Sequence, residues 1–325
     1  MQAKAIARSN IALIKYWGKR RQKYNLPAVG SISITLDRLQ TVTDVGFSSS
    51  LEKDRFTLNG HLVENEQLER VSRFLNLIRK KAGFNDRAQV ITTNNFPTAA
   101  GLASSASGFA ALTLAACKAA GLDFTKKELS ILARQGSGSA ARSIYGGFVH
   151  MYRGQSEDGH DAYAEQIATE KDWDLSVVIA ITQALPKETG STSGMVKSRE
   201  TSPYYDAWVE TGENDLKAMK AAIDRRDFTH VGQLCEYSCL KMHALALSTR
   251  PAIIYWNGIT LDVMHTIRQL RKEGREVYFT IDAGPQVKAI CRTSDRQAVQ
   301  DRIQQIEGIK QILTTNLGGD AELID

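Results

Sequence analysis

Two lysines and an aromatic pair follow an apolar run close to the N-terminus. They form the segment Lys15-Tyr16-Trp17-Gly18-Lys19. Ammonium groups at this spacing could neutralise a phosphate or a carboxylate. They could also be lysines that simply face solvent, and this segment alone leaves both interpretations open.

Another cation, Arg142, stands in a loop rich in glycine and serine, residues 136–147. Serine hydroxyls, backbone amides and a forked guanidinium are the donors that multidentate phosphate recognition needs. We therefore expect this loop to bind an anion, because a flexible turn with a surface arginine explains its composition less well.

A further anion-binding candidate is the stretch 94–108, where Pro97 and Gly101 lead into small and hydroxylated residues. An apolar helical pattern follows and stops at Gly121. Unpaired N–H groups and the positive end of the dipole gather at a helix N-terminus, and small side chains let a phosphate approach. A small-residue loop packed tightly before a buried helix fits equally well. No Gly-Lys-Ser/Thr follows, so this is not a Walker P-loop.

Asp282 ends a predicted strand, residues 276–281, and begins the turn Asp-Ala-Gly-Pro. An aspartate in this position either stabilises the turn or serves as a positioned acid or base. From the residues alone, an aspartate that stabilises the turn is the favoured interpretation.

Cys235, Cys239 and His243 share one face of a predicted helix, which raises the question of a zinc site. Their spacing is unlike that of paired-cysteine zinc sites, and no fourth ligand is apparent in the sequence. Since cysteine often behaves as a small buried hydrophobe, we expect core packing.

The elements that must position these groups are a mixture of strands and helices, which predicts an α+β fold. Apolar alternation predicts strands at residues 3–8, 31–36, 41–47, 55–58, 88–93, 148–152, 175–181, 276–281 and 309–315. Helical periodicity with capping signals predicts helices at residues 66–82, 109–120, 125–135, 228–246, 260–273 and 296–306. Another helix is expected to begin at Pro203, after an N-cap at Ser202, and to break near Gly212. The polar loop 187–193 marks the expected boundary between domains 1–185 and 186–325.

Length and composition fit a globular protein of about two domains. The 325 residues carry a formal net charge of +5. This excess could gather a polyanionic small molecule, whereas no dense basic tract predicts nucleic-acid binding. No apolar run is long enough for a membrane span, and no signal-peptide core is apparent. The four cysteines form no disulfide framework, so a reducing cytoplasm is expected.

Four segments of the chain resemble the diphosphomevalonate decarboxylases of the GHMP kinase superfamily. They are residues 10–20, 95–106, 136–143 and 281–285. They occur in family order at family-like separations and span almost the whole chain. The Tyr-Trp-Gly-Lys segment is more specific than the glycine loops, which the kinases of the superfamily share in looser form.

The resemblance implies a ribosomal-protein-S5-like N-terminal domain and a ferredoxin-like C-terminal domain, with the active site in the cleft between them. It also implies ATP, Mg²⁺ and a homodimer. The implied reaction phosphorylates the tertiary 3-hydroxyl of (R)-5-diphosphomevalonate, because a free hydroxyl leaves poorly. Departure of that phosphate and loss of the carboxylate as CO₂ then give isopentenyl diphosphate.

The resemblance also assigns roles residue by residue. Asp282 would orient or deprotonate the 3-hydroxyl, and Lys15 would stabilise charge beside Asp282 and the transferring phosphoryl group. The implied substrate-binding residues are Asn10, Tyr16, Lys19, Ser137, Gly138, Ser139, Arg142, Ser191 and Thr192. The implied ATP phosphate loop contains Pro97, Ala99, Ala100, Gly101, Leu102, Ala103, Ser104, Ser105 and Ser107, with Ser104 or Ser105 nearest the metal.

Three alternatives compete with this interpretation. A relative on the same scaffold could be a mevalonate 3-kinase, or could decarboxylate a monophosphate. Asp282 argues against a kinase that lacks this carboxylate, and Tyr16, Lys19 and Arg142 argue for a diphosphate. A basic nucleic-acid-binding module would leave both glycine loops and Asp282 unexplained.

Overall fold

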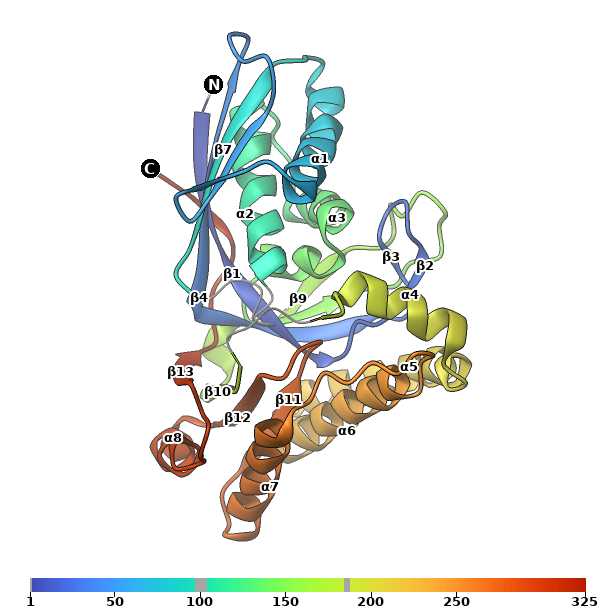
Figure 1. Cartoon of the computed structure of the whole chain (residues 1–325), viewed down its shortest axis with the longest axis vertical. Coiled ribbons are helices and arrows are strands. Elements are labelled where there is room, and N and C mark those ends of the chain that lie inside the picture. The colour runs from blue at the N-terminus through green and yellow to red at the C-terminus, as the bar shows by residue number, and fades with distance from the viewer. Residues whose placement is uncertain (1, 97–103, 184–187) are drawn as a thin grey trace.

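The computed structural model describes residues 2–96, 104–183 and 188–325. Two sheets, each covered by helices, organise these residues (Figure 1). The first sheet has eight strands in the order β14-β1-β4-β7-β5-β6, with β8 pairing β4 and β9. Its strands are β1 (Gln2–Ile14), β4 (Ser31–Ser48), β5 (Arg55–Leu58), β6 (His61–Val63), β7 (Arg87–Asn94), β8 (Phe148–Met151), β9 (Ala164–Ala168) and β14 (Glu322–Ile324).

Helices from the N-terminal half cover one face of this sheet (Figure 1). They are α1 (Glu66–Ala82), α2 (Ser104–Ala119) and α3 (Lys126–Gly136), followed by the short 3-10 helix η1 (Gly138–Ile144). The capping box that the sequence predicts at the start of α3 is confirmed, since Thr125 and Glu128 bond each other's backbone N–H groups. A small hairpin of β2 (Lys19–Arg21) and β3 (Leu26–Pro27) stands apart from the sheet.

The second sheet is antiparallel, in the order β11-β12-β10-β13. Its strands are β10 (Leu175–Ile181), β11 (Val277–Ile281), β12 (Val287–Arg292) and β13 (Gln311–Asn316). The helices of this half are α4 (Ser191–Thr201), α5 (Tyr205–Asp224), α6 (Phe228–Leu247), α7 (Gly258–Lys272) and α8 (Arg296–Gln304). Two short 3-10 turns, η2 (Glu170–Asp172) and η3 (Thr293–Asp295), complete the elements of the described residues. The α+β prediction with two sheet-based halves is confirmed.

Strand β10 explains why its sequence is almost wholly apolar. Val177 and Ile179 face a core shared with the first sheet, α5 and α6, while Val178 and Ala180 face α7 and α8. A strand buried on both faces has no polar side. The sequence-based domain boundary at residue 185 stays a prediction, although β10 itself belongs to the second sheet.

Strand β1 serves both cores because its register shifts between Arg8 and Asn10. Before the shift, Ala5 and Ala7 face the helices α1 and α2; after it, Ile11 faces the core between the two sheets. Across this shift β1 advances two residues while β4 advances five, and such an irregularity can exchange the two faces of a strand. Asn10 is therefore turned to the helix side of the first sheet, where η1 lies.

Three local predictions around α4 and α5 are wrong. The predicted loop at 187–193 contains the start of α4 at Ser191. Ser202 ends α4 rather than beginning a helix, and α5 begins at Tyr205. The expected break at Gly212 is absent because this glycine lies inside α5, where an added Cβ would come within 2.9 Å of Val29.

Helix α6 lies very close to β11, and this spacing sets the position of the end of that strand. A Cβ on Gly232 of α6 would collide with the Tyr278 ring of β11. Further along α6, the Cys239 Sγ accepts from the Ile281 N–H at 3.2 Å, and His243 Nε2 donates to the Ile281 carbonyl at 3.3 Å. The helix therefore holds the last residue of β11 in place.

We expect Gly232→Ala to destabilise the protein by about 1–3 kcal/mol, the usual cost of overpacking a tight contact. Gly108→Ala in α2 is the matched control, because nothing lies within 4 Å of its added Cβ. It should stabilise the helix by about 0.5–1 kcal/mol. Urea unfolding of both variants measures the difference, and equal effects would contradict the proposed close contact.

Candidate functional site

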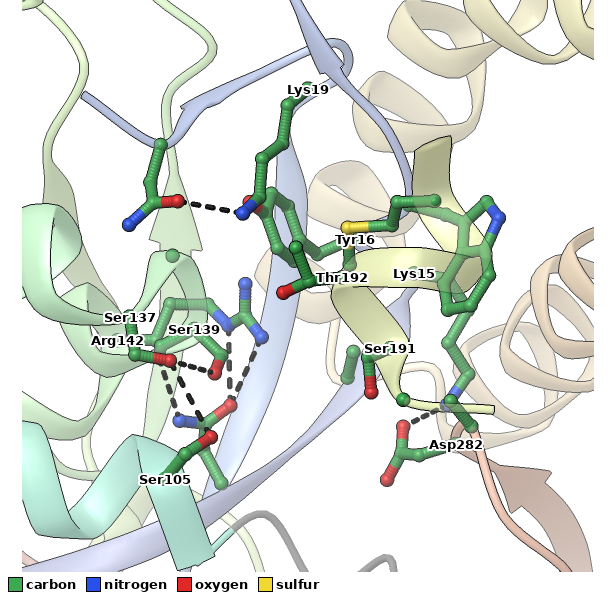
Figure 2. Close-up of a pocket in the computed structure, with 18 of the residues that line it drawn as sticks. Lys15, Tyr16, Lys19, Ser105, Ser137, Ser139, Arg142, Ser191, Thr192 and Asp282 are labelled. Carbon is green, nitrogen blue, oxygen red and sulfur yellow. Dashed lines mark hydrogen bonds and ion pairs between the residues drawn. The ribbon is translucent and has the colours of Figure 1, made fainter. Parts of the chain in front are cut away.

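A cavity of about 400 Å³ lies where β1, η1, α2, α4 and the end of β11 meet (Figure 2). The described polar residues that line it are Asn10, Lys15, Tyr16, Lys19, Asn25, Arg70, Ser104, Ser105, Ser137, Ser139, Arg142, Ser191, Thr192 and Asp282. In Figure 2, the group around Arg142 lies on one side and the pair Lys15–Asp282 on the other, with Ser191 and Thr192 between.

The pair Lys15–Asp282 joins the two sheets. Lys15 Nζ, just after β1, donates to Asp282 Oδ1, just after β11, at 2.7 Å. The Lys15 side chain is 1% exposed and that of Asp282 is 25% exposed. The buried ammonium therefore meets a carboxylate that remains open to the cavity.

A second lysine, Lys288 of β12, places its Nζ 3.3 Å from Asp282 Oδ2. Burial would raise the pKa of the Asp282 carboxyl, but Lys15 and Lys288 together lower it well below its ordinary value. Asp282 is therefore an ionised acceptor at neutral pH, poor at storing a proton.

The helix behind this pair contributes neutral groups. Burial, with Lys15 nearby, lowers the pKa of His243 to about 3, and burial raises the pKa of Cys239 to about 11. Both α6 side chains are buried against Ile281. The core packing expected for Cys235, Cys239 and His243 is confirmed, and no cluster of metal-binding side chains occurs within the described parts of the chain.

Arg142 and Asn10 form the other side of the site. The buried guanidinium donates to Asn10 Oδ1 from Nη2 at 3.1 Å and to Ser31 Oγ from Nη1 at 2.6 Å. The Asn10 amide donates onward to the Ser139 carbonyl at 3.1 Å and to Ser143 Oγ at 2.7 Å. Burial lowers the pKa of Arg142 to about 10, with Asp282 opposing the shift, so this cation stays charged at neutral pH.

The predicted glycine–serine loop is largely the 3-10 helix η1, a correction to the sequence analysis. Its hydroxyls meet the start of α2, since Ser137 Oγ lies 3.5 Å from Ser105 Oγ and 3.4 Å from Ser139 Oγ. Gly138 is required by space, because a Cβ there would collide with the Tyr16 hydroxyl. That hydroxyl is buried without a hydrogen-bond partner among the described residues, which suits it to donate to a ligand.

Lys19 stands at one end of the cavity, where its Nζ donates to Asn25 Oδ1 at 2.7 Å. Burial, with a contribution from Arg70, lowers the pKa of Lys19 to about 8. Arg70, on α1, donates to the Gly136 carbonyl from Nη2 at 2.8 Å. Its guanidinium thereby ties α1 to the end of α3, just before η1.

The structure brings most of the predicted site residues together. Asn10, Lys15, Tyr16, Lys19, Ser104, Ser105, Ser137, Gly138, Ser139, Arg142, Ser191, Thr192 and Asp282 all line the one cavity. Ser107 instead lies beneath it, bonded to Thr41 Oγ1 at 2.7 Å. Pro97, Ala99, Ala100, Gly101, Leu102 and Ala103 lie outside the described residues.

Sequence reasoning missed three neighbours of the site: Asn25, Arg70 and Lys288. Arg70 occupies the polar side of an amphipathic helix, and Asn25 sits in a turn. Lys288 interrupts a run of apolar residues in β12, 1% exposed. This interruption was the signal that could have identified it, because a charge buried in a strand needs a partner.

The donors present fit a magnesium ion bound mainly through a ligand. Mg²⁺ prefers oxygen ligands and commonly takes one or two from protein, the rest from phosphates and water. Ser104 and Ser105 line the cavity at the start of α2 and supply hydroxyl oxygens there.

Two family models match the chain in succession. Residues 7–164 match a diphosphomevalonate decarboxylase-like N-terminal domain. Residues 177–321 match a mevalonate 5-diphosphate decarboxylase C-terminal domain. Together these matches cover most strands of both sheets and all the described site residues.

Curated relatives and solved structures agree with the models. The chain is 38% identical over 301 residues to a Saccharomyces cerevisiae diphosphomevalonate decarboxylase, covering 87% of this chain and 76% of the relative. It is 40% identical over 295 residues to the Homo sapiens one, covering 85% and 73%. A solved structure described as MDDEF in complex with MVAPP, AMPPCP and magnesium matches with a TM-score of 0.94 and 40% identity, over 100% of this chain and 99% of that one. Mevalonate diphosphate decarboxylase from Staphylococcus aureus matches with a TM-score of 0.94 and 38% identity, over 100% and 98%.

The low pKa of Lys19 makes anion binding in this cavity sensitive to pH. Lys19 is charged below pH 8 and loses its proton above it, while a bound anion raises that pKa by favouring the charged form. Between pH 7 and 9.5, the affinity of the wild-type protein for inorganic pyrophosphate should fall about tenfold more than that of Lys19→Met. Calorimetry measures both affinities. The protonation of pyrophosphate itself is common to both titrations, so parallel curves would remove Lys19 from the anion site.

Proposed function

The chain belongs to the diphosphomevalonate decarboxylase family, and we propose that it converts (R)-5-diphosphomevalonate and ATP to isopentenyl diphosphate, CO₂, ADP and phosphate. The observation that carries this proposal is the Lys15–Asp282 pair, 2.7 Å apart, which opens on a cavity lined otherwise by cations and hydroxyls. The two ends of the cavity suit different parts of one substrate, an alcohol at Asp282 and anionic groups at Arg142 and Lys19.

The charge of the cavity supports a polyanionic ligand. Among its described lining residues, Lys15, Lys19, Arg70 and Arg142 are cationic, and Asp282 is the carboxylate. A cleft that is lined by charges of one sign and has low-dielectric walls focuses the electric field. It thereby concentrates ligands of the opposite charge. A diphosphate, a carboxylate and a nucleoside triphosphate together provide that charge.

Asp282 is proposed to accept a hydrogen bond from the substrate 3-hydroxyl. This bond would direct the hydroxyl oxygen toward the transferring phosphoryl group. Because its pKa is held low, the carboxylate takes the proton as the oxygen–phosphorus bond forms rather than beforehand. Lys15 lies within the same hydrogen-bonded pair and is proposed to stabilise the charge on the transferring phosphoryl group.

Arg142 and Asn10 are proposed to hold the substrate carboxylate or diphosphate, since their mutual bonds fix both side chains before a ligand arrives. Tyr16, Lys19, Ser137, Gly138 and Ser139 would complete this anion site, with Ser191 and Thr192 at the start of α4 as further contacts. Trp17, Met195 and Met242 form an apolar wall of the cavity and would exclude water beside the tertiary carbon.

Ser104 and Ser105 are proposed to lie nearest the ATP phosphates and to offer hydroxyl oxygens to Mg²⁺. When bound, Mg²⁺ neutralises charge on the phosphate oxygens. The backbone at the start of α2 adds the positive end of a helix dipole to the same region.

The cytoplasmic location and the homodimer that the sequence analysis expects stay predictions. No helix within residues 2–96, 104–183 and 188–325 is long and apolar enough to cross a membrane. Light scattering on the purified protein tests the homodimer directly, and a mass of one chain would exclude it.

One assay tests the proposed reaction. Purified protein is incubated with ATP, Mg²⁺ and diphosphomevalonate, while CO₂, isopentenyl diphosphate and ADP are followed together. Equal yields of the three support the decarboxylase. ADP without CO₂ would identify a 3-kinase. Turnover only in a parallel reaction with the monophosphate would identify a monophosphate decarboxylase.

We expect Asp282→Asn to lower kcat by about 10³-fold or more, within the range by which positioned acid–base groups act. Substrate binding should be largely retained, because the anion contacts lie at the other side of the cavity. Steady-state kinetics and calorimetric binding separate the two effects. Near-native turnover in this variant would remove Asp282 from the mechanism.

A further inference from the structure

Lys288 is a charged side chain in an apolar part of the structure. In the second sheet it lies opposite Thr280 of β11 on one side and Ile179 of β10 on the other. Its strand neighbour on the same face, Ile290, and the paired Ile179 both belong to the core between the two sheets. Burying an ammonium group there costs free energy that only close polar partners can offset.

The contacts of Lys288 point toward the site. Its Nζ lies 3.3 Å from Asp282 Oδ2 and donates to the Gln286 carbonyl at 3.3 Å. Asp282 and Gln286 begin and end the turn between β11 and β12, so one ammonium group bridges the turn that presents the carboxylate. Gln286 is itself fixed, since its Oε1 accepts from the Thr182 N–H at 2.6 Å.

The two lysines approach Asp282 from different sides. Lys15 lines the cavity, whereas Lys288 is not among the described lining residues and reaches Asp282 from within the second sheet. Each takes one carboxylate oxygen, Lys15 at Oδ1 and Lys288 at Oδ2. A ligand that enters the cavity can therefore meet Lys15 directly, while Lys288 stays behind the carboxylate.

We propose that Lys288 is a positioning residue for the reaction: it holds Asp282 and balances its charge from behind, which allows Lys15 to turn from the carboxylate to the transferring phosphoryl group. The inference rests on the proposed function. Without Lys288, Lys15 would be the remaining ion-pair partner of Asp282 among the described residues and would have to neutralise two anions at once.

Other titratable groups also face this pair. Arg142 of η1 is close enough to Asp282 for its pKa to be affected, and Cys235, Cys239 and His243 of α6 lie behind Lys15. Burial keeps the two thiols and the imidazole uncharged at neutral pH. The pH dependence of Asp282 therefore follows from Lys15 and Lys288, with Arg142 as a more distant cation.

The test replaces Lys288 by Met, which retains an unbranched side chain without charge, and by Arg, which retains the charge. We expect kcat of Lys288→Met to fall by about 10–100-fold with KM for both substrates within about threefold. The acid limb of its kcat–pH profile should move upward by about one unit or more. Lys288→Arg should recover part of kcat and the original limb.

A direct titration of the Asp282 carboxyl separates the proposed role of Lys288 from a loss of turnover. In the ligand-free protein, ¹³C NMR follows the Asp282 carboxyl, assigned by its absence in Asp282→Asn, and its titration midpoint should rise in Lys288→Met. Lys288→Gln serves if the Met variant does not fold. A wild type that releases no CO₂ overturns the proposed function, and the NMR titration still decides on Lys288. A lower melting temperature with an unchanged pH profile, kcat and carboxyl titration would show that Lys288 only supports the fold, and would overturn the proposal.

Discussion

The hydrogen-bonded ion pair between Lys15 and Asp282 is the contact on which the site depends, because its partners come from different sheets and lie 267 residues apart in the chain. A bond of 2.7 Å tolerates little relative movement of the two halves. Further bonds therefore fix the end of β1 beside α6 and β11. The Lys15 N–H donates to Ser238 Oγ at 2.9 Å, and Thr280 Oγ1 donates to the Ala12 carbonyl at 3.3 Å. The apolar core between the sheets supports these polar contacts from below.

Burying the positive charges of the ligand-free site costs electrostatic free energy, which a bound anion would offset. Lys15, Arg142 and Lys288 are each nearly inaccessible to solvent, and all three lie around one carboxylate. Burial of unbalanced positive charge disfavours the ligand-free state, as the lowered pKa values of Arg142 and Lys288 indicate. An anionic ligand that binds only the folded form adds to its stability by mass action. Much of the arrangement is thus preorganised for charge that the substrates supply.

The sequence predicts what depends on neighbours along the chain and misses what depends on packing. The capping box at Thr125, the helix α6 and the strand that ends just before Asp282 all follow from local pattern. The start of α4 at Ser191 does not, because its sequence is polar and its Gly194 packs closely against Trp17 and Tyr255. The resemblance to a family identified Lys15 and Asp282 as partners, which periodicity could not. Lys288 was identified by neither, because no strand was predicted at 287–292 and the apolar residues around this lysine were not recognised as a buried strand.

The pairing of β14 with β1 has a consequence for how the protein is made. Lys4 lies opposite Ile324, so in the described part of the chain this edge of β1 pairs with β14, which follows the other described strands in sequence. During synthesis, the first sheet can assemble most of its strands while that edge remains open to other chains. Strand β1 carries Asn10 after its register shift and leads into Lys15. An early mispairing at this edge would therefore displace both residues before β11 is synthesised. Strand β14 is made after the other described strands, so it closes this edge late and from then on shields it from other chains.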